Sequence, residues 1–218
     1  MTSMTLRHGP STMLRPGLYL ITPDESDATR LLERVVPLLP FAACLQLRSK
    51  TLTTATRGHV ALALRDACHA AGVAFIVNDD ANLARDVGAD GVHLGEHDGS
   101  ITGARALLGD HAIIGASCYD DLQRARNAVA DGAHYVAFGA FFPSPTKPGA
   151  RRASLALLEG SVGLGVPRVA IGGITPDNAA PLVAAGADMI AVISGVFDAP
   201  DPVAAARAYL SCFEERRP

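Results

Sequence analysis

Polar side chains alternate with leucines at the end of one apolar segment of the sequence. Gln46, Arg48 and Lys50 stand two residues apart, and Leu45 and Leu47 stand between them. In an extended strand this spacing places the polar set on one face and the leucines on the other. Two cations that lose water on one face need a counter-charge, and an anionic ligand would supply it. A structural ion pair with a neighbouring aspartate would account for the same pattern.

Acidic residues follow the next two apolar segments. Asn78, Asp79 and Asp80 close the segment 74–78, and Asp98 follows the segment 91–95. Carboxylates from two adjacent strand ends can share a hard cation, and Mg²⁺ is typically held by one or two carboxylates together with substrate phosphates. Cations and carboxylates in neighbouring loops therefore indicate a diphosphate–Mg²⁺ site. Asp80 directly precedes a predicted helix, and we interpret it as the N-cap.

One histidine allows two interpretations. His93 lies inside the segment 91–95, between Val92 and Leu94. A histidine in this setting is either a buried, hydrogen-bonded core residue or a catalytic group, and the sequence favours neither. No cluster of histidines and cysteines has the spacing of a zinc site.

Small residues precede the last two predicted helices, as Gly172-Gly173 and Ser194-Gly195. In eight-stranded barrels, phosphate sites commonly form from these two loops through backbone N–H groups. A tight turn explains a glycine pair equally well. The position after the last two strands favours the phosphate site.

The segment 143–149, Pro-Ser-Pro-Thr-Lys-Pro-Gly, carries two hydroxyl groups and one lysine. As a lid it would bring these groups onto two anionic substrates and exclude water. A plain surface turn is the alternative.

Eight short apolar runs carry or precede these residues, and a segment with helical spacing follows each. The runs span 17–22, 43–48, 74–78, 91–95, 112–117, 135–139, 167–172 and 189–194. Thr175-Pro176 and Asp201-Pro202 have the sequence of helix starts. Eight even units of ~27 residues predict the α/β class and a single (βα)8 TIM barrel, whose strand ends converge on one face. An open doubly wound sheet is the alternative, although no GxGxxG follows the first run.

The composition fits one domain and excludes several functional classes. Of the 218 residues, 49% are hydrophobic and 19% charged, and the net charge is -3. The lack of a basic surplus argues against a nucleic-acid partner, and no apolar run reaches the roughly 18–20 residues of a membrane-spanning helix. We expect residues 1–16 to form a flexible N-terminal extension, without a signal peptide, and residues 17–218 to form the barrel. Four scattered cysteines without a CxxC pair indicate a cytoplasmic protein.

In their order and spacing, the motifs of this chain resemble those of the thiamine phosphate synthase family. The matching motifs are Leu20-Ile21-Thr22, the block 46–50, Asn78-Asp79-Asp80, the block 90–95 with Asp98, Gly115-Ala116-Ser117, Ser144-Pro145-Thr146-Lys147, Ile171-Gly172-Gly173-Ile174 and Ala191-Val192-Ile193-Ser194. The resemblance implies a barrel that joins the diphosphate of hydroxymethylpyrimidine to a thiazole phosphate, or to its carboxylated form. The products would be thiamine phosphate and diphosphate. The path would be an Mg²⁺-assisted dissociative displacement through a pyrimidinylmethyl cation, with one Mg²⁺ per subunit.

The resemblance also implies roles for individual residues. The pyrimidine-diphosphate site would comprise Gln46, Leu47, Arg48, Ser49, Lys50, Asn78, Ser117 and Lys147, and Asp79 and Asp98 would bind Mg²⁺. The thiazole-phosphate site would comprise Ser144, Pro145, Thr146, Gly173, Ile193 and Ser194. Catalysis is expected from Arg48, Lys50, Ser117 and Lys147, without a covalent nucleophile.

Three positions depart from the family pattern. Glu96 stands where Gln is common, Tyr119 where His is common, and Ser144 where Thr is common. Glu96 would either add negative charge near the Mg²⁺ or face water.

Other functions stay open at the level of sequence. A thiazole tautomerase-like paralogue would keep the thiazole-phosphate side without the full diphosphate site, and a sugar-phosphate isomerase is another phosphate-handling barrel. A non-catalytic thiamine phosphate-binding protein would lack a metal or leaving-group contact. Cations and carboxylates together favour the synthase. Exposed apolar helix faces would permit a homo-oligomer, and the oligomeric state stays open.

Overall fold

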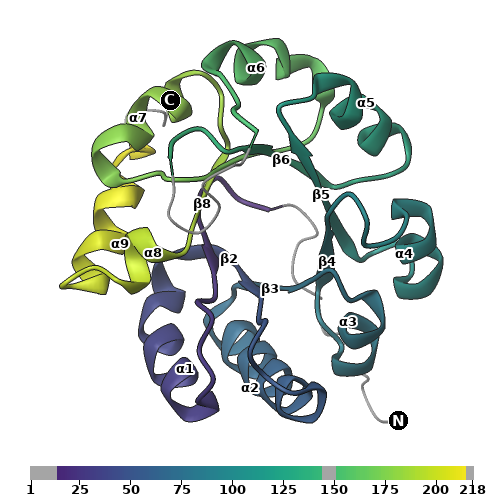
Figure 1. Cartoon of the computed structure of the whole chain (residues 1–218), viewed down its shortest axis with the longest axis vertical. Coiled ribbons are helices and arrows are strands. Elements are labelled where there is room, and N and C mark those ends of the chain that lie inside the picture. Colours follow the sequence, from purple (N-terminus) through teal and green to yellow (C-terminus); the bar gives the residue numbers. More distant parts are fainter. Residues whose placement is uncertain (1–13, 144–150, 215–218) are drawn as a thin grey trace, which may run out of the picture.

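Parallel strands close into a barrel in the computed structural model of the chain, which describes residues 14–143 and 151–214. Within these ranges eight strands pair in chain order, and β1 pairs with β8 to complete the circle (Figure 1). The strands are β1 (Gly17–Ile21), β2 (Ala42–Leu47), β3 (Ala74–Asn78), β4 (Gly91–Leu94), β5 (Ile113–Tyr119), β6 (Tyr135–Gly139), β7 (Arg168–Ile171) and β8 (Met189–Val192). The predicted (βα)8 barrel is confirmed, and so are all the predicted runs.

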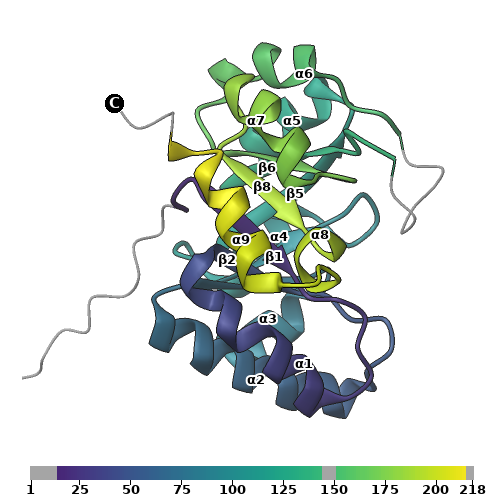
Figure 2. The ribbon, with the colours of Figure 1, turned by 90° about the vertical axis from the view of Figure 1, so that its left-hand side faces the viewer.

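Helices form a ring outside the strands. They are α1 (Ala28–Val35), η1 (Val36–Phe41), α2 (Thr54–Ala71), α3 (Ala81–Val87), α4 (Ile101–Leu108), α5 (Leu122–Ala130), α6 (Leu155–Gly160), η2 (Val162–Leu164), α7 (Pro176–Ala184), α8 (Ser194–Phe197) and α9 (Pro202–Ser211), where η denotes a 3₁₀ helix. Figure 2 shows α1 and α2 on one flank of the barrel and α6 and α7 on the opposite flank. One detail differs from the sequence prediction: Ser194 and Gly195 do not directly precede the last helix but form the first residues of the short α8, and α9 follows it.

Alternation along each strand separates two apolar cores. In β2, Leu45 and Leu47 are buried in the core that lies between the strands and the helices. Cys44 belongs to a second core inside the barrel, and Gln46 faces the same way, since its amide bonds Tyr19 in the interior. The predicted faces of this strand are therefore confirmed.

Capping groups define the helix ends as the sequence indicates. Thr175 and Asn178 form a reciprocal capping box at the start of α7, and the Asp201 carboxylate accepts the Ala204 N–H at the start of α9. The long α2 ends at Gly72, whose φ of 68° is the left-handed conformation that glycine adopts without strain.

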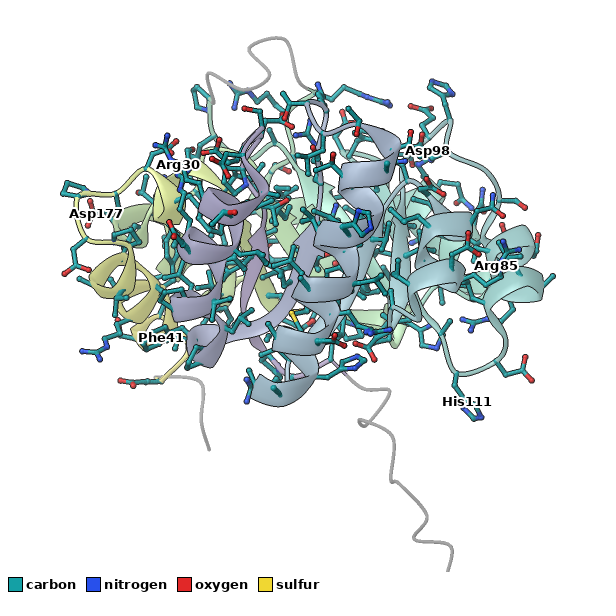
Figure 3. All side chains as sticks on the ribbon, turned by 90° about the horizontal axis from the view of Figure 1, so that it is seen from below. Arg30, Phe41, Arg85, Asp98, His111 and Asp177 are labelled. Atoms are coloured by element: carbon teal, nitrogen blue, oxygen red, sulfur yellow. The ribbon has the colours of Figure 1, made fainter. Side chains whose placement is uncertain are left out.

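The two ends of the barrel differ in what they carry. Figure 3 shows Asp98, which follows a strand, at one end, and Phe41 and His111, which precede strands, at the other. At the latter end Arg168, only 9% exposed, pairs with Asp188 at 3.0 Å, which ties two strand starts together. Side chains that could act on a ligand lie at the opposite end, where barrel enzymes carry their active sites.

The chain termini lie partly beyond the described ranges. Residues 1–13 and 215–218 are outside them, so the division into an extension of residues 1–16 and a barrel of residues 17–218 stays a prediction. None of the described helices is both long and apolar enough to cross a bilayer.

Candidate active site

A cavity of about 590 Å³ opens at the carboxyl end of the strands. Most of the site residues predicted from the sequence line it: Gln46, Arg48, Ser49, Lys50, Asn78, Asp79, Asp98, Ser117, Gly173, Ile193 and Ser194. A smaller cavity of about 370 Å³ lies beside it and shares Ser49, Asn78, Asp79 and Asp98. The fold thus gathers residues that are up to 148 positions apart, from Gln46 to Ser194, around one space.

The loop after β1 holds the basic loop after β2 in place. The Thr22 hydroxyl donates to the Arg48 carbonyl at 2.7 Å and accepts the Arg48 N–H at 2.9 Å. One oxygen of Asp24 accepts the Lys50 N–H at 2.6 Å, and the other pairs with the Arg48 guanidinium at 3.2 Å. Arg48 thus has the neighbouring aspartate that the sequence allowed, and it still lines the cavity.

Two carboxyl groups meet on the other side of this basic loop. Asp79 follows β3, Asp98 lies in the loop after β4, and their side chains interact directly. The Gly95 N–H donates to Asp98 at 3.1 Å and fixes its orientation. Burial and the adjacent Asp98 together raise the pKa of Asp79 from 3.8 to about 6, although Asn78 and Arg48 oppose the shift. The neighbouring positive charge of Arg48 therefore does not offset the burial and mutual repulsion of the two carboxylates.

Backbone strain is confined to this end of the barrel. Asp79 with φ of 63° and Tyr119 with φ of 55° are the non-glycine residues of the described ranges that adopt positive φ. Such conformations cost energy and cluster at functional sites. At Asp79 the left-handed turn directs the chain sharply from β3 toward α3, whose N-cap is Asp80.

Asp80 has the structural role that the sequence indicated. Its carboxylate accepts the Leu83 N–H at 2.9 Å and pairs with Arg57 at 2.9 Å. It is therefore a helix cap, whereas its neighbour Asp79 faces the cavity.

His93 is part of a buried polar network inside the barrel. Its Nδ1 lies 2.9 Å from the Tyr135 hydroxyl, and its Nε2 lies 2.9 Å from the Ser117 hydroxyl. Burial lowers the pKa of His93 from 6.5 to about 4, so the ring is neutral near pH 7. Tyr135 also bonds Tyr19 at 2.7 Å, and Tyr19 donates to Gln46 at 2.6 Å.

Glycines form the opposite wall of the cavity. Gly172 and Gly173 have φ of 103° and 63°, so both need the conformational freedom of glycine. A Cβ on Gly173 would lie 2.3 Å from the Pro143 carbonyl oxygen. The backbone between β7 and α7 therefore approaches the loop after β6 closely, next to Ile193 and Ser194 on the cavity wall.

Glu96 forms ion pairs with two arginines at the rim of the cavity. It accepts from Arg151 at 2.6 Å and lies 3.7 Å from Arg124. The hydrogen bond from Arg151 lowers the pKa of Glu96. The Arg151 guanidinium also stacks over Tyr119, with its carbon 4.2 Å from the ring centre. Two of the three residues that depart from the family pattern, Glu96 and Tyr119, thus share one arginine at the rim.

Some predicted residues lie elsewhere. Ser144, Pro145, Thr146 and Lys147 lie outside the described residues. Leu47 does not line the large cavity: its side chain is 2% exposed, is packed beneath the helices and borders only the smaller cavity. A side chain on the outer face of β2 cannot reach the barrel interior.

Three lining residues, Tyr19, Tyr119 and Arg151, were not among the predicted site residues, and neither was the buried Tyr135, which bonds His93 behind the cavity wall. Tyr19 stands two residues before Ile21 in the first run, and this period of two was the signal that it faces inward. Tyr135 begins its run and carried no such signal.

The acidic pair suits a hard cation. Within residues 14–143 and 151–214, no group of three or more His, Cys, Asp or Glu side chains is placed to hold a metal. Two carboxylates alone leave positions for water and for ligand phosphate oxygens, which is the way Mg²⁺ is usually bound. Burial and the adjacent Asp98 raise the pKa of Asp79, and a divalent cation bound there would favour the ionised form of both carboxyl groups.

Sequence comparison connects this geometry to known proteins. A family model described as thiamine monophosphate synthase matches residues 18–196. The thiamine-phosphate synthase of Xanthomonas campestris pv. campestris is 58% identical over 206 residues, which cover 94% of this chain and 100% of that protein. The thiamine-phosphate synthase of Xylella fastidiosa is 52% identical over 197 residues, which cover 90% of this chain and 84% of that protein.

Structural comparison agrees. A thiamine phosphate pyrophosphorylase from Pyrococcus furiosus superposes with a TM-score of 0.81 at 35% identity, over 93% of this chain and 97% of that one. A 3-hexulose-6-phosphate synthase has a TM-score of 0.72 at 21% identity, over 89% of this chain and 99% of that one, and this likeness shows the fold alone. The match of the family model across the barrel and the identity to full-length relatives show that the chain belongs to the thiamine-phosphate synthase family.

Proposed function

We propose that this chain condenses 4-amino-2-methyl-5-(diphosphooxymethyl)pyrimidine with a thiazole phosphate to give thiamine phosphate and diphosphate. The observation that carries the proposal is the convergence of Arg48 and Lys50 with Asp79 and Asp98 on one cavity. Cations and a carboxylate pair at one mouth suit a diphosphate that is bound together with Mg²⁺. Family membership agrees with this activity.

Departure of the diphosphate is the step that the basic loop serves. Negative charge develops on the leaving group, and the Arg48 guanidinium and the Lys50 ammonium stabilise it without giving up a proton. Asp24 orients Arg48, because it pairs with the guanidinium at 3.2 Å. When bound by Asp79 and Asp98, Mg²⁺ supplies further charge stabilisation to the diphosphate oxygens. Lys147 is proposed to join this set.

The thiazole phosphate is proposed to bind on the glycine wall. Gly173, Ile193 and Ser194, which follow β7 and β8, line this side of the cavity. Their role would be to hold the thiazole ring so that its nitrogen faces the pyrimidine methylene carbon, which carries positive charge as the diphosphate leaves. Ser144, Pro145 and Thr146 are proposed to complete this subsite.

No protein group is needed as a nucleophile or a base. The thiazole nitrogen carries a lone pair and forms the new bond, and the bond to the diphosphate oxygen breaks. His93 is a weak base, since burial lowers its pKa to about 4. Its contacts are with Ser117 and Tyr135, which makes it a structural member of the pocket wall.

The alternative functions explain less of the site. A tautomerase-like barrel that handles the thiazole phosphate alone has no use for Arg48, Asp79 and Asp98 around one cavity. A thiamine phosphate-binding protein without activity does not require a pair of adjacent carboxylates without a basic partner between them. We further infer a cytoplasmic location, which is supported by the buried thiols of Cys44, Cys68 and Cys118.

A mixing assay tests the proposed function. The protein is incubated with the pyrimidine diphosphate, the thiazole phosphate and Mg²⁺, and both thiamine phosphate and free diphosphate are quantified. We expect the two products in equal amounts and neither product when one substrate or Mg²⁺ is omitted. Absence of thiamine phosphate from the complete mixture would refute the proposal. Repeating the assay with the carboxylated thiazole phosphate identifies the preferred form.

A further inference from the structure

A continuous hydrogen-bond chain crosses the barrel interior from Ser117 to Asp79. Its bonds join Ser117 to His93, His93 to Tyr135, Tyr135 to Tyr19, Tyr19 to Gln46, Gln46 to Asn78, and Asn78 to Asp79. The members come from β5, β4, β6, β1, β2 and β3, in that order, and the last member directly follows β3. The chain therefore links the candidate metal ligand Asp79 through the barrel interior to Ser117, which also lines the cavity.

The carboxylate of Asp79 determines which way the first bonds run. An ionised carboxylate accepts hydrogen bonds and donates none, so the Asn78 amide must direct its Nδ2 toward Asp79, at 2.6 Å. The Asn78 Oδ1 then faces Gln46, which must direct its own Nε2 toward it. The Gln46 Oε1 is left to face Tyr19 and needs a donor there.

The direction continues through the two tyrosines because each hydroxyl has one hydrogen. Tyr19 gives its hydrogen to Gln46, so Tyr135 must donate to the Tyr19 oxygen, at 2.7 Å. Tyr135 has then used its hydrogen and must accept from the Nδ1–H of His93. The Nε2 of the neutral ring carries no hydrogen, and the Ser117 hydroxyl donates to it at 2.9 Å.

The two tyrosines are fixed in this arrangement by packing. Tyr19 is 1% exposed and Tyr135 is 0% exposed, so water does not replace either hydroxyl. Gly115, on the strand beside Tyr135, leaves the space for its ring, because a Cβ there would lie 2.0 Å from the ring. The rings of Tyr19 and Tyr135 also meet edge to face, with centres 5.8 Å apart.

We propose that Tyr19 and Tyr135 are positioning residues for the pyrimidine diphosphate. Through them, Asp79 sets the direction of donation along the whole hydrogen-bond chain, which we call its polarity. The two tyrosines thereby hold the Gln46 amide and the His93 ring in one orientation each. Gln46 then presents one N–H and one oxygen lone pair in fixed places on the cavity wall. A heteroaromatic ring that offers a ring nitrogen beside an amino group is the ligand chemistry that matches such a pair. This inference rests on the proposed function for the identity of the substrate.

The tautomer of His93 shows the direction of donation along the hydrogen-bond chain, and it can be measured without any substrate. In ligand-free protein near pH 7, we expect long-range ¹H–¹⁵N NMR to show the hydrogen on Nδ1 and none on Nε2, with the signal assigned by its loss in His93→Gln. Asp79→Asn allows the chain to reverse, because an amide at this position can donate, and should move the His93 signals toward the Nε2–H form. The matched control is Asp80→Asn, which alters the helix cap and should leave the tautomer unchanged. A hydrogen on Nε2 in the unmodified protein, or no response to Asp79→Asn, would overturn the inferred polarity.

Kinetics test the positioning role. Tyr19→Phe removes the donor to Gln46, and Tyr135→Phe removes the donor to Tyr19. Each variant should raise KM for the pyrimidine diphosphate about tenfold, which is the effect expected for the loss of one hydrogen bond. KM for the thiazole phosphate should not change. Tyr209→Phe is the matched control, since it removes a buried hydroxyl that does not belong to the hydrogen-bond chain. This hydroxyl donates to the Ile174 carbonyl at 2.7 Å.

The outcomes separate the two proposals. If the tyrosine variants raise both KM values, or if Tyr209→Phe raises KM for the pyrimidine diphosphate equally, the hydroxyls have only a structural role and the positioning role is refuted. Melting temperatures of all three variants show whether the fold is retained. If the unmodified protein makes no thiamine phosphate, the proposed function fails, whereas the His93 tautomer still decides the polarity.

Discussion

Asp79 and Asp98 follow different strands, yet their carboxyl groups lie against each other at the mouth of the barrel. Burial disfavours the charged form of Asp79, and the adjacent Asp98 adds to the cost, so the pKa of Asp79 rises to about 6. Arg48 is near enough to oppose this shift, but it is already paired with Asp24. A divalent cation would neutralise the pair, and the pair is therefore the feature from which the metal proposal can be tested.

Removal of either carboxylate should abolish the Mg²⁺-dependent rate. We expect Asp79→Ala or Asp98→Ala to lower turnover by roughly 100-fold or more, because the charge stabilisation of the leaving diphosphate is lost. The measurement is turnover across a Mg²⁺ titration. Asp80→Ala serves as the control, since Asp80 caps α3 and should affect stability alone. An unchanged Mg²⁺ dependence in both site variants would refute the metal assignment.

Stability of the metal-free protein should depend on pH through Asp79. Its pKa is about 6 in the folded protein and about 4 when unfolded, so the folded state binds the proton more tightly between these values. Stability contributed by Asp79 therefore falls as pH rises from about 4 to about 6. The pKa of His93 is lowered to about 4 in the folded protein, so the stability that His93 contributes increases as pH rises. Comparison of urea unfolding in the unmodified protein and in Asp79→Asn isolates the Asp79 effect.

We expect Asp79→Asn to gain stability relative to the unmodified protein as pH rises through this window. Saturating Mg²⁺ should remove most of the difference, because the cation stabilises only the ionised pair. A constant difference between the two proteins at all pH values, or a difference that Mg²⁺ enlarges, would contradict the electrostatic origin of the pKa shift.

Arg48 should act on the pyrimidine substrate alone. Loss of a charge-assisted hydrogen bond in Arg48→Ala should raise KM for the pyrimidine diphosphate roughly 10- to 100-fold, with an intermediate effect for Arg48→Lys, which keeps the charge but not the planar fork. Initial rates with each substrate varied in turn provide the measurement. Arg30→Ala is the control, since Arg30 is exposed and pairs with Glu25 at 3.2 Å. An equal increase in KM for the thiazole phosphate would show that Arg48 does not discriminate between the subsites.

Gly173 should be needed for space as well as for conformation. Gly173→Ala and Gly132→Ala both place a side chain at positive φ, which costs about 1 kcal/mol. Only the Cβ at position 173 meets backbone, since no atom lies within 4 Å of a Cβ on Gly132. We therefore expect a larger drop in melting temperature for Gly173→Ala, together with weaker binding of the thiazole phosphate by calorimetry. Equal thermal effects and unchanged binding would remove Gly173 from the subsite.

The barrel could be predicted because its physical requirements repeat along the chain. Each strand needs a short apolar run, each helix needs a cap such as Thr175 or Asp201, and the loops after the strands carry the polar residues. The alternation in β2 was enough to place Gln46 inside and Leu45 outside. The family was recognised from these same loops, and the comparisons confirm it.

Contacts between distant loops could not be predicted in the same way. Glu96 and Arg151 are 55 positions apart, and only the closed barrel brings them to 2.6 Å. The Glu96 carboxylate was expected either to lie near the metal or to face water; it is exposed, and its pairing with arginine was not predicted. Tyr135 belongs to the site because Gly115 on the adjacent strand leaves space for its ring, which a pattern within one segment does not reveal.

The central claim is that Asp79 and Asp98 hold the divalent cation on which the diphosphate is bound next to Arg48. The most direct measurement is a crystal structure of the protein with thiamine phosphate, diphosphate and Mn²⁺ in place of Mg²⁺, recorded where manganese scatters anomalously. We expect one anomalous peak within coordination distance of both carboxylates, with the diphosphate in contact with the Arg48 guanidinium. A peak away from the carboxylate pair, or a diphosphate bound without Arg48, would contradict the claim.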